Sequence, residues 1–403
     1  MVKRYMHRSR IVICLVFLVF TWVGFAQEEA NYTFELKETE LVPVGDSNNI
    51  FFDYDLDGDL DLIISGYNND FSEVTSTHTF LYTNDGKGNF TIDKRSSFMG
   101  IEYGKIDVGD IDNDKDLDIV ITGQELIKNK EGGIVIYKNE NAVFKKIKKI
   151  EPDRAYSVYA NFIDVNNDQY EDLLVELNDS IKFYINDKKG DFLAAGNLEG
   201  IDEVYEYGVI PFDMDNDGDI MLQGEYGYEL EPKTLLFKNN SGKYESVSHN
   251  FKNTFQGIVV PVDIDNDGDQ DVFMTNLGSI SENLDESFFY IKEEGSFKES
   301  VSDVLVYNIV QSCFVDLDSD GDKDLIIMGN RKELNKPGYY SEAIDIYENK
   351  EGVFELIKTA AFPFLGQSSI NTADVDGDGN QDVLLTGYEG ETPRTRLYIN
   401  KLK

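Results

Sequence analysis

The chain has very little cysteine, tryptophan or histidine. Two cysteines, one tryptophan and three histidines occur in 403 residues, and both Cys14 and Trp22 lie in the first 26. We interpret those 26 residues as a removable targeting segment. Only Cys313 would then remain, so no disulfide can form within the mature chain, even in an oxidising compartment. The loss of the tryptophan also disfavours a sugar site built on stacking against indole.

The first 26 residues have the composition of a secretory signal peptide. An apolar run covers residues 11–20, and Gly24-Phe25-Ala26 supplies a small-x-small cleavage signal. The basic residues before the run are Lys3, Arg4, Arg8 and Arg10. We therefore expect an exported protein, secreted, periplasmic or held at the cell surface, with a mature form that begins near Gln27. The apolar run is short for a membrane span and no second run follows, so the alternative is an uncleaved N-terminal anchor.

Positive charge is also scarce. The chain has 37 lysines and arginines against 76 aspartates and glutamates, a formal net charge of −39. Removing residues 1–26 takes away four basic residues and no acidic one, so the net charge becomes −43. Such a surface repels nucleic acid and anionic lipid, so we expect neither as a partner.

A short acidic motif, in contrast, occurs seven times. Its clearest copy is Asp263-Ile264-Asp265-Asn266-Asp267-Gly268-Asp269-Gln270-Asp271. The other copies begin at Asp53, Asp110, Asp164, Asp213, Asp316 and Asp374. Successive copies start 49 to 58 residues apart, a period typical of propeller blades or solenoid coils.

The spacing of the carboxylates within the motif indicates a metal site. Acidic side chains at positions 1, 3, 5 and 9 repel one another unless a cation offsets their charge. Calcium accepts six to eight oxygen ligands in a flexible geometry, which alternate aspartates and a carbonyl at position 7 can supply. Glycine at position 6 permits the sharp turn. Magnesium demands a tighter octahedron and retains its waters, so it fits less well.

The motif has two other possible interpretations. An EF-hand loop needs a glutamate at position 12 and flanking helices, but position 12 is apolar in six copies, and so an EF-hand is rejected. These six residues are Ile64, Ile121, Val175, Met274, Ile327 and Leu385. One copy alone could be an ordinary solvated turn. Seven copies in register favour metal binding.

Each unit contains four short segments with the composition of strands. In the first unit they are residues 49–52, 62–66, 79–84 and 88–92. Four-stranded units repeated around an axis form a β-propeller. The last unit lacks its fourth strand, and residues 32–36 form an unassigned strand at the start, so we expect these two to pair. The prediction is an all-β, seven-bladed β-propeller of four-stranded antiparallel blades, which fills residues 27–403 as one domain.

With these loops and strands, the chain resembles the FG-GAP or VCBS repeat family, the seven-bladed propellers also found at the N-terminus of integrin alpha chains. The resemblance implies about six calcium sites between the first two strands of the blades, and ligands that approach the opposite face. Position 7 would contribute its carbonyl. The implied ligands are Asp53, Asp55, Asp57, Asp59 and Asp61; Asp110, Asp112, Asp114, Asp116 and Asp118; Asp164, Asn166, Asp168, Tyr170 and Asp172; Asp213, Asp215 and Asp217; Asp263, Asp265, Asp267, Asp269 and Asp271; Asp316, Asp318, Asp320, Asp322 and Asp324; and Asp374, Asp376, Asp378, Asn380 and Asp382.

Three copies depart from the family pattern. Lys115 and Gln169 replace the glycine at position 6 of the second and third copies, and the third also has one charge fewer. We expect both copies to bind more weakly. The fourth copy is two residues shorter to the following glycine and places Met221 at position 9, so we expect its site to be weakened or empty.

The preferred function is a non-catalytic binding or adhesion module for a protein or a glycan. The loops expected on the face opposite the metals are rich in tyrosine, a residue favoured at interfaces. The loops after the second strands contain Tyr67, Tyr226, Tyr228, Tyr339, Tyr340 and Tyr388, and the loops before the first strands contain Tyr103, Tyr156, Tyr205 and Tyr207. The alternative is that these tyrosines are ordinary packed loop residues.

An enzyme that acts on polysaccharides is the second hypothesis. It would need a general acid and base, and the mature chain has only His78 and His249 as histidines, neither with a visible catalytic companion. The carboxylates are already explained by metal. A concave funnel lined by tyrosine with histidine or lysine would favour an enzyme, and a flat rim would favour a binding module.

Overall fold

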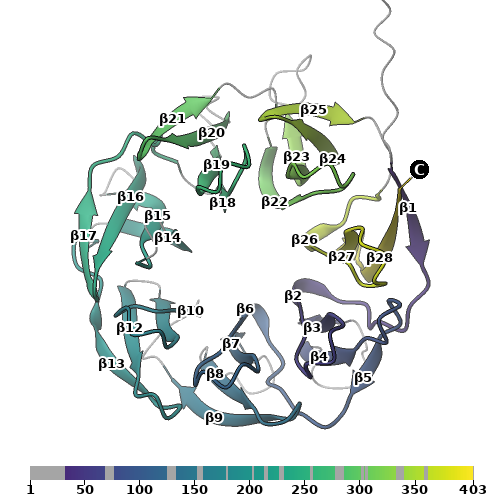
Figure 1. The fold of residues 1–403 in the computed structure, drawn as a ribbon, viewed down its shortest axis with the longest axis horizontal. Helices are drawn as coiled ribbons and strands as arrows, with labels where there is room; N and C mark the ends of the chain where they lie inside the picture. The colour runs from purple at the N-terminus through teal and green to yellow at the C-terminus, as the bar shows by residue number, and fades with distance from the viewer. Residues whose placement is uncertain are drawn as a thin grey trace, which may run out of the picture.

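The computed structural model of the chain describes residues 32–68, 77–124, 133–151, 158–177, 180–201, 204–212, 217–226, 231–254, 257–276, 286–300, 304, 307–332, 340–357 and 362–402. The predicted targeting segment, residues 1–26, lies outside these ranges. Within them, 28 strands form seven four-stranded antiparallel sheets that are arranged as the blades of a ring (Figure 1). Among the same residues, no helix has the length and apolar character needed to cross a membrane.

The blades follow one another along the chain. The first consists of β2 (Gly45–Phe52), β3 (Asp61–Tyr67), β4 (Thr77–Thr83) and β5 (Thr91–Asp93). The second consists of β6 (Glu102–Gly109), β7 (Asp118–Gln124), β8 (Gly133–Asn139) and β9 (Phe144–Ile150). The third consists of β10 (Val158–Ile163), β11 (Asp172–Leu177), β12 (Ser180–Asn186) and β13 (Phe192–Asn197). The fourth consists of β14 (Val204–Pro211), β15 (Ile220–Tyr226), β16 (Glu231–Asn240) and β17 (Lys243–Val247).

The remaining three blades repeat this order. The fifth consists of β18 (Val259–Val262), β19 (Asp271–Asn276), β20 (Glu286–Glu293) and β21 (Ser296–Ser300). The sixth consists of β22 (Tyr307–Val315), β23 (Asp324–Lys332), β24 (Tyr340–Lys350) and β25 (Val353–Ile357). The seventh consists of β26 (Gly366–Ala373), β27 (Asp382–Glu389), β28 (Thr392–Leu402) and β1 (Tyr32–Lys37). The predicted fold is therefore confirmed.

The ring closes through its seventh blade, as predicted. Strand β1 pairs with β28 in antiparallel register, from Tyr32 opposite Leu402 to Lys37 opposite Leu397. Figure 1 shows the two strands, purple and yellow, side by side on the rim. Because the first strand of the chain completes the last sheet, that sheet has no unpaired third strand at its edge.

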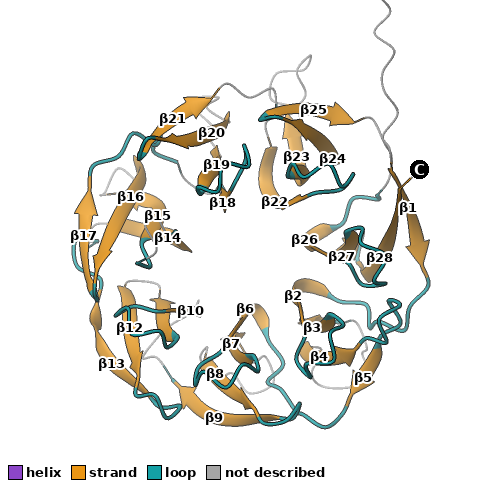
Figure 2. Ribbon diagram, in the orientation of Figure 1, coloured by secondary structure: helices purple, strands orange, loops and turns teal. Residues whose placement is uncertain are grey.

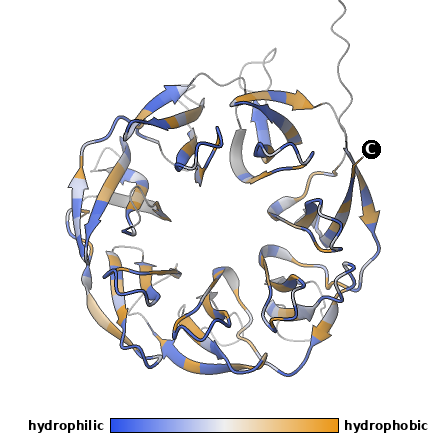
Figure 3. Cartoon of the chain, in the orientation of Figure 1, coloured by the Kyte–Doolittle hydropathy of each residue, from blue (hydrophilic) through white to orange (hydrophobic). Residues whose placement is uncertain are grey.

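The hydrophobic core lies between the blades. The first strand of each blade is nearest the axis and the fourth is at the perimeter (Figure 2). Clusters of buried apolar side chains join each pair of neighbouring blades, for example Val120 of the second with Leu173 of the third. Second strands are covered on both faces, which explains their continuous apolar runs, such as the fully buried Leu62 and Ile63. In Figure 3, hydrophobic and hydrophilic segments alternate along the other strands.

Five blades carry the same bulge near the start of their first strand. Two residues of that strand oppose one residue of the second strand, as in the step from Gly45 to Asn48 opposite Gly66. The other steps are Glu102 to Lys105, Tyr205 to Gly208, Asn308 to Gln311 and Gly366 to Ser369. A glycine lies opposite each one, because a side chain there would strike the bulge. A Cβ on Gly66 would come within 2.7 Å of the Gly45 carbonyl oxygen.

An asparagine at the end of most third strands ties each blade to the preceding one. The side-chain amide of Asn139, in the second blade, donates to the carbonyl oxygen of Tyr54 in the first blade at 2.8 Å and to that of Leu117 at 3.4 Å. Its backbone N–H donates to the buried Asp118 carboxylate at 2.7 Å. The same bond to the preceding blade, 2.6 to 2.9 Å long, is made by Asn84, Asn186, Asn239, Asn349 and Asn400. In the fifth blade the place is taken by Lys292.

We predict that Asn139→Ala lowers the free energy of unfolding by about 1–3 kcal/mol, because the buried carbonyl of Tyr54 would lose its donor. Urea unfolding in calcium-containing buffer would measure the change. The control is Asn89→Ala, at an exposed position where the amide bonds only to Asp85, and we expect its effect to be well below that of Asn139→Ala. Equal effects of the two substitutions would contradict a special role for the link between blades.

Candidate functional site

The seven acidic loops join the first strand of each blade to the second, as predicted, and lie on one face of the ring. Neighbouring loops contact each other directly. The Asn113 amide of the second loop donates to the Gln169 carbonyl of the third at 2.9 Å. The Asn266 amide of the fifth loop donates to the Gly321 carbonyl of the sixth at 2.8 Å.

The carboxylates at positions 1 and 5 shape the loops, apart from the fourth, whose residues 213–216 lie outside the described ranges. In the first loop, Asp53 accepts the backbone N–H groups of Asp57 at 3.2 Å and Gly58 at 3.1 Å. Asp57 accepts the N–H of Asp59 at 3.0 Å. This winding requires a left-handed backbone at position 6, where Gly58 has φ +96°. Lys115 and Gln169, which replace this glycine in the second and third loops, have φ +77° and +69°, a conformation that strains a residue with a side chain.

The aspartate at position 9 is buried beneath the loop. Asp61 is 0% exposed and accepts two backbone N–H groups, from Tyr54 at 3.3 Å and Asn84 at 2.8 Å. Burial raises the pKa of Asp61 to about 7. Desolvation disfavours the charged carboxylate, and a neighbouring cation would restore it. This residue therefore supports the fold as well as facing the ligand cluster above it.

In five loops the acidic oxygens converge closely enough to hold a metal ion. Ligand atoms of three carboxylates lie within 4.8 Å of one another in each of these loops. The clusters are Asp53, Asp55 and Asp57; Asp110, Asp112 and Asp118; Asp263, Asp265 and Asp271; Asp316, Asp318 and Asp320; and Asp374, Asp376 and Asp382. These clusters come from the described part of the chain, and each contains residues predicted as ligands.

Buried oxygens in these loops test whether a metal ion fits. Each of the five loops has at least one buried carboxylate oxygen without a hydrogen-bond partner: Asp55, Asp112, Asp263, Asp316 and Asp376 provide one each, and Asp116 provides a second in the second loop. A buried carboxylate oxygen without a donor is costly unless a cation coordinates it. The all-oxygen donor set suits a hard divalent ion. The residues of these loops therefore fit the metal that the sequence predicts.

The third and fourth loops are different. In the third loop, Asn166 supplies a neutral oxygen that is also buried without a partner, and Lys188 pairs with Asp168 at 3.1 Å. In the fourth loop, Asp213 and Asp215 lie outside the described residues. The predicted role of Asp213 and Asp215 as metal ligands stays a prediction. The same holds for the carbonyl oxygen at position 7 of every loop.

The strand register corrects the alignment of the fourth loop. Pro211 pairs with Ile220, so Asp219 and not Met221 occupies the place of Asp61. Asp219 is 0% exposed and accepts the N–H of Asn239 at 2.7 Å. The sequence alignment missed this residue because it counted nine positions from the start of the motif. Counting back from the apolar run 220–222 would have found it, and the deletion then falls inside the loop.

The residue that precedes the third-strand asparagine differs in charge from blade to blade, and so it changes the electrostatics of the loops. In the second blade it is Lys138, whose ammonium group contacts Asp112 and lies 3.6 Å from Asp114. In the sixth blade it is Glu348, which is 7% exposed and helps to raise the pKa of Asp318, after burial and Asp320. The second loop thus carries its own cation, whereas the sixth carries an additional carboxylate.

We predict that Lys138→Thr strengthens cation binding at the second loop by tenfold or more. The threonine copies Thr83, which lies at the same place in the first blade, and removes a positive charge that competes with the metal. Calcium titration by calorimetry would measure the change in affinity. The control Lys145→Thr removes an exposed lysine of the same blade that pairs with Glu140. A loss of affinity in Lys138→Thr would show that the lysine orders the loop and does not compete.

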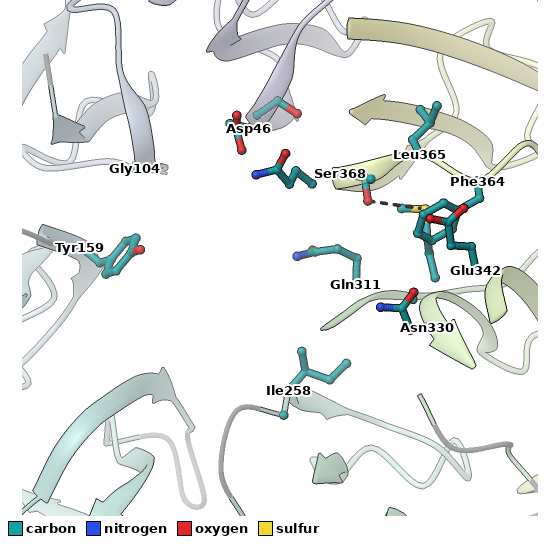
Figure 4. A pocket seen from close by; sticks show the side chains of 16 residues that line it. Asp46, Gly104, Tyr159, Ile258, Gln311, Asn330, Glu342, Phe364, Leu365 and Ser368 are labelled. Atoms are coloured by element: carbon teal, nitrogen blue, oxygen red, sulfur yellow. Dashed lines mark hydrogen bonds between the residues drawn. The ribbon is translucent and has the colours of Figure 1, made fainter. Parts of the chain in front are cut away.

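A cavity of about 590 Å³ opens at the ring axis on the face opposite the acidic loops. Its residues come mainly from the starts of first strands, including Asp46 and Ser368, and from β23, including Asn330 (Figure 4). First strands end at the acidic loops, so their starts lie at the other face. The cavity is lined by Tyr159, but no histidine or lysine is among its described lining residues. The cavity therefore has the concave shape and the tyrosine expected of an enzyme site, but its described lining has neither histidine nor lysine.

Of the predicted ligand-face tyrosines, Tyr67 and Tyr388 have described side chains, and neither is among the described lining residues of this cavity. Tyr388 packs its ring against Gly45 and donates its hydroxyl to Asp46 at 3.1 Å, so it positions a lining residue. Tyr67 is half-buried at the end of β3. The structure describes the backbone but not the side chains of Tyr103, Tyr205, Tyr207, Tyr226 and Tyr340. Tyr156, Tyr228 and Tyr339 lie outside the described residues. The sequence did not predict Tyr159, because the predicted ligand face consisted of loops and Tyr159 lies within β10, the inner strand of the third blade.

Both histidines have structural surroundings. His249 is half-buried, its Nε2 lies 3.0 Å from the Thr234 carbonyl oxygen, and burial lowers its pKa. The His78 ring stacks on Phe80 at 5.4 Å between centroids. Neither ring lies at the axial cavity.

A half-buried acidic group lies beside Tyr159, one of the residues that line the axial cavity. Glu176, on β11, accepts the N–H of Val209 at 3.1 Å and lies opposite Tyr159 in the sheet. Burial raises its pKa from the ordinary value of 4.5 to about 7, although the hydrogen bond and Lys105 act in the other direction. A pKa that is raised in the folded state means that the protonated form is favoured by folding. Its contribution is complete below about pH 4.5 and is lost as the pH rises through 7.

We predict that Glu176→Gln raises the free energy of unfolding at pH 8 by about 2–3 kcal/mol and leaves it unchanged near pH 4.5, because glutamine stays neutral and can still accept the bond. Urea unfolding at both pH values, in saturating calcium, would measure this. Glu38→Gln, at an exposed position, is the matched control and should alter neither value. Destabilisation by Glu176→Gln at pH 8 would show that the charged carboxylate is the form the fold prefers.

Comparisons with known proteins agree with this architecture. A family model described as FG-GAP-like repeat matches residues 53–121 and 316–385. No curated protein sequence matches the chain. An Agrocybe aegerita lectin, described in its recognition of non-reducing terminal N-acetylglucosamine, superimposes with a TM-score of 0.53 at 15% identity, over 79% of this chain and 81% of the lectin.

Two further structures share the fold. BBS1N, solved in complex with ARL6DN, has a TM-score of 0.53 at 11% identity, over 93% of this chain and 98% of that one. A protein from Lactobacillus plantarum has a TM-score of 0.50 at 10% identity, over 83% and 94% of the two chains. At these identities the likeness concerns the fold alone. The chain is a seven-bladed β-propeller, and two of its stretches, residues 53–121 and 316–385, match the FG-GAP-like repeat.

Proposed function

We propose that this protein is an exported, non-catalytic binding module whose ligand, a glycan or a protein, meets the face opposite the acidic loops. The observation that carries the proposal is the axial cavity on that face, whose lining mixes polar and apolar side chains and includes no described histidine or lysine. The composition of residues 1–26 supports export. The acidic loops then serve as structural calcium sites, outside the cell, where calcium is abundant.

Calcium at these loops would act on more than one blade. Each ion would hold the first and second strands of its blade at their shared turn. Through the buried aspartate and asparagine, the same loop is bonded to the next blade, as Tyr54 is to Asn139. At about 1 mM calcium and a Kd of about 10 µM, each site would stabilise the folded state by roughly 2.7 kcal/mol. Several such sites together would exceed the usual stability margin of a domain.

Proteins of similar fold support both ligand classes. The Agrocybe aegerita lectin recognises a terminal sugar, and BBS1N was solved with a protein partner. For this chain, the net charge of −39 disfavours acidic partners of either kind. The axial cavity is small enough for a sugar end or a short loop of a partner protein.

We predict that chelation of calcium lowers the melting temperature by tens of degrees, because several ions bind only the folded state. Circular dichroism during heating, with calcium or with EDTA, would measure it. Asp263→Ala should lose one ion in calorimetric titration, whereas Asp191→Ala, which removes an exposed aspartate outside the loops, should lose none. A melt that EDTA leaves unchanged would overturn the structural role of calcium.

The binding function is tested with the mature protein in calcium. We expect retention on an array of glycans or of cell-surface proteins, with no release of product from soluble polysaccharides over hours. Product formation in the presence of calcium would show that the protein is an enzyme and would contradict the proposed non-catalytic function. A protein denatured by heat is the control for non-specific retention, and equal retention of both would contradict the proposal.

A further inference from the structure

We propose that the axial cavity holds the uncharged end of a saccharide, with its hydroxyl groups bonded by Gln311, Asn330 and Ser368. This inference rests on the binding function proposed above and assigns its site and ligand class. It draws on four independent features of the cavity: its polar groups, the lack of partners for those groups, the backbone that presents them, and its charge.

The lining includes several side chains that both donate and accept hydrogen bonds. Gln311, Asn330 and Ser368 reach the cavity from β22, β23 and β26, and Ser47 joins them from β2. Figure 4 shows Gln311 and Asn330 near one another on one side of the opening, with Tyr159 on the other side. Amides and hydroxyls of this kind suit sugar hydroxyls, which need a donor and an acceptor side by side. An ammonium ligand would need acceptors only.

Several of these groups have no strong partner within the protein. The side-chain amides of Gln311 and Asn330 make no hydrogen bond to any described part of the chain. The Ser368 hydroxyl donates to the sulfur of Met328 at 3.5 Å, drawn dashed in Figure 4. A thioether is a weak acceptor, so a ligand oxygen would be a better one. The cavity therefore presents polar groups whose bonding capacity the fold leaves unused.

The backbone at the cavity is bulged so that extra side chains face the axis. Ser47 and Ser368 both lie in first-strand bulges, beside Asp46 with φ +45° and Gln367 with φ +44°. Non-glycine residues in this region are strained, and such strain gathers at functional sites. Tyr388 then fixes the Asp46 carboxylate by its hydroxyl, 3.1 Å away.

The charge of the cavity selects among saccharides. Asp46 and Glu342 line it, and no described lysine or arginine does. Uronic or sialic acids would be repelled by both carboxylates. Ile258 and Phe364 supply apolar wall against which the C–H face of a pyranose can pack. The volume of about 590 Å³ lies within the range of small-molecule sites.

The test uses the calcium-loaded mature protein and calorimetric titration with two probe sets, neutral oligosaccharides and uronate oligosaccharides of equal length. We expect wild type to bind a member of the neutral set and no uronate. The double variant Gln311→Ala with Asn330→Ala should lose affinity at least tenfold. Asn240→Ala, at an exposed site on the rim, is the matched control and should bind as wild type does. Thermal melting confirms that every variant is folded.

A second pair of substitutions keeps the proposal falsifiable if the double variant unfolds. Asp46→Asn with Glu342→Gln removes both charges and keeps the side-chain shapes, so we expect it to admit uronate oligosaccharides. Neutral-sugar binding that survives the alanine variant would overturn the assigned site and leave the binding function standing. Wild-type binding of a protein but of no saccharide would overturn the ligand class alone. Failure to bind anything would overturn both the inference and the proposed function.

Discussion

The fold depends on a buried carboxylate that is bonded by backbone N–H groups from two directions. Asp118 accepts the N–H of Ile111 inside its own loop at 3.0 Å and that of Asn139 at the end of the third strand at 2.7 Å. The Asn139 side chain then bonds to the loop of the preceding blade. One aspartate therefore fixes the turn, the sheet beneath it and, through its partner, the neighbouring sheet. Without these bonds, each acidic loop would be a surface turn with no effect on its neighbours.

This arrangement links metal binding to the packing of the ring, and the strength of that link differs between blades. Lys138 supplies a cation to one loop, and Glu348 adds an anion to another. In the fifth blade, Lys292 takes the place of the asparagine and directs its ammonium group to Asp269 in its own loop, 3.1 Å away. That blade follows the shortened fourth loop. The repeat therefore varies more in its electrostatics than in its strand order, so the ions need not bind alike.

The sequence predicted the features that depend on period and on local chemistry. Seven blades, the pairing of residues 32–36 with the last blade and the place of the acidic loops all followed from spacing. The prediction went wrong where a deletion moved the register, because Asp219 could be recognised only by counting back from the strand. The five bulges were also readable in principle, since a glycine such as Gly66 stands opposite each of them. Blades three and five lack the glycine, and the described strand pairs there, from Val158 and Val259 onward, show no bulge.

The axial cavity could not be predicted, because its residues come from several blades and are brought together only by closure of the ring. Gln311 and Ser368 belong to adjacent blades, and Tyr159 reaches the same space from the far side of the ring. No local pattern marks them. Tyrosine-rich loops were a reasonable guide to a binding face, yet Tyr388, the described loop tyrosine that bonds to a lining residue, contributes by holding Asp46.

The closing pair of strands also determines how the ring would be oriented by an attachment. Third strands run toward the acidic loops, and β28 brings Asn400 to the Leu317 carbonyl there. Since Tyr32 pairs with Leu402, both strand ends meet at that same face. Any segment joined before residue 32 or after residue 402 would leave from the metal side of the rim. A tether to a membrane or wall would therefore turn the acidic loops toward the cell and leave the axial cavity pointing outward.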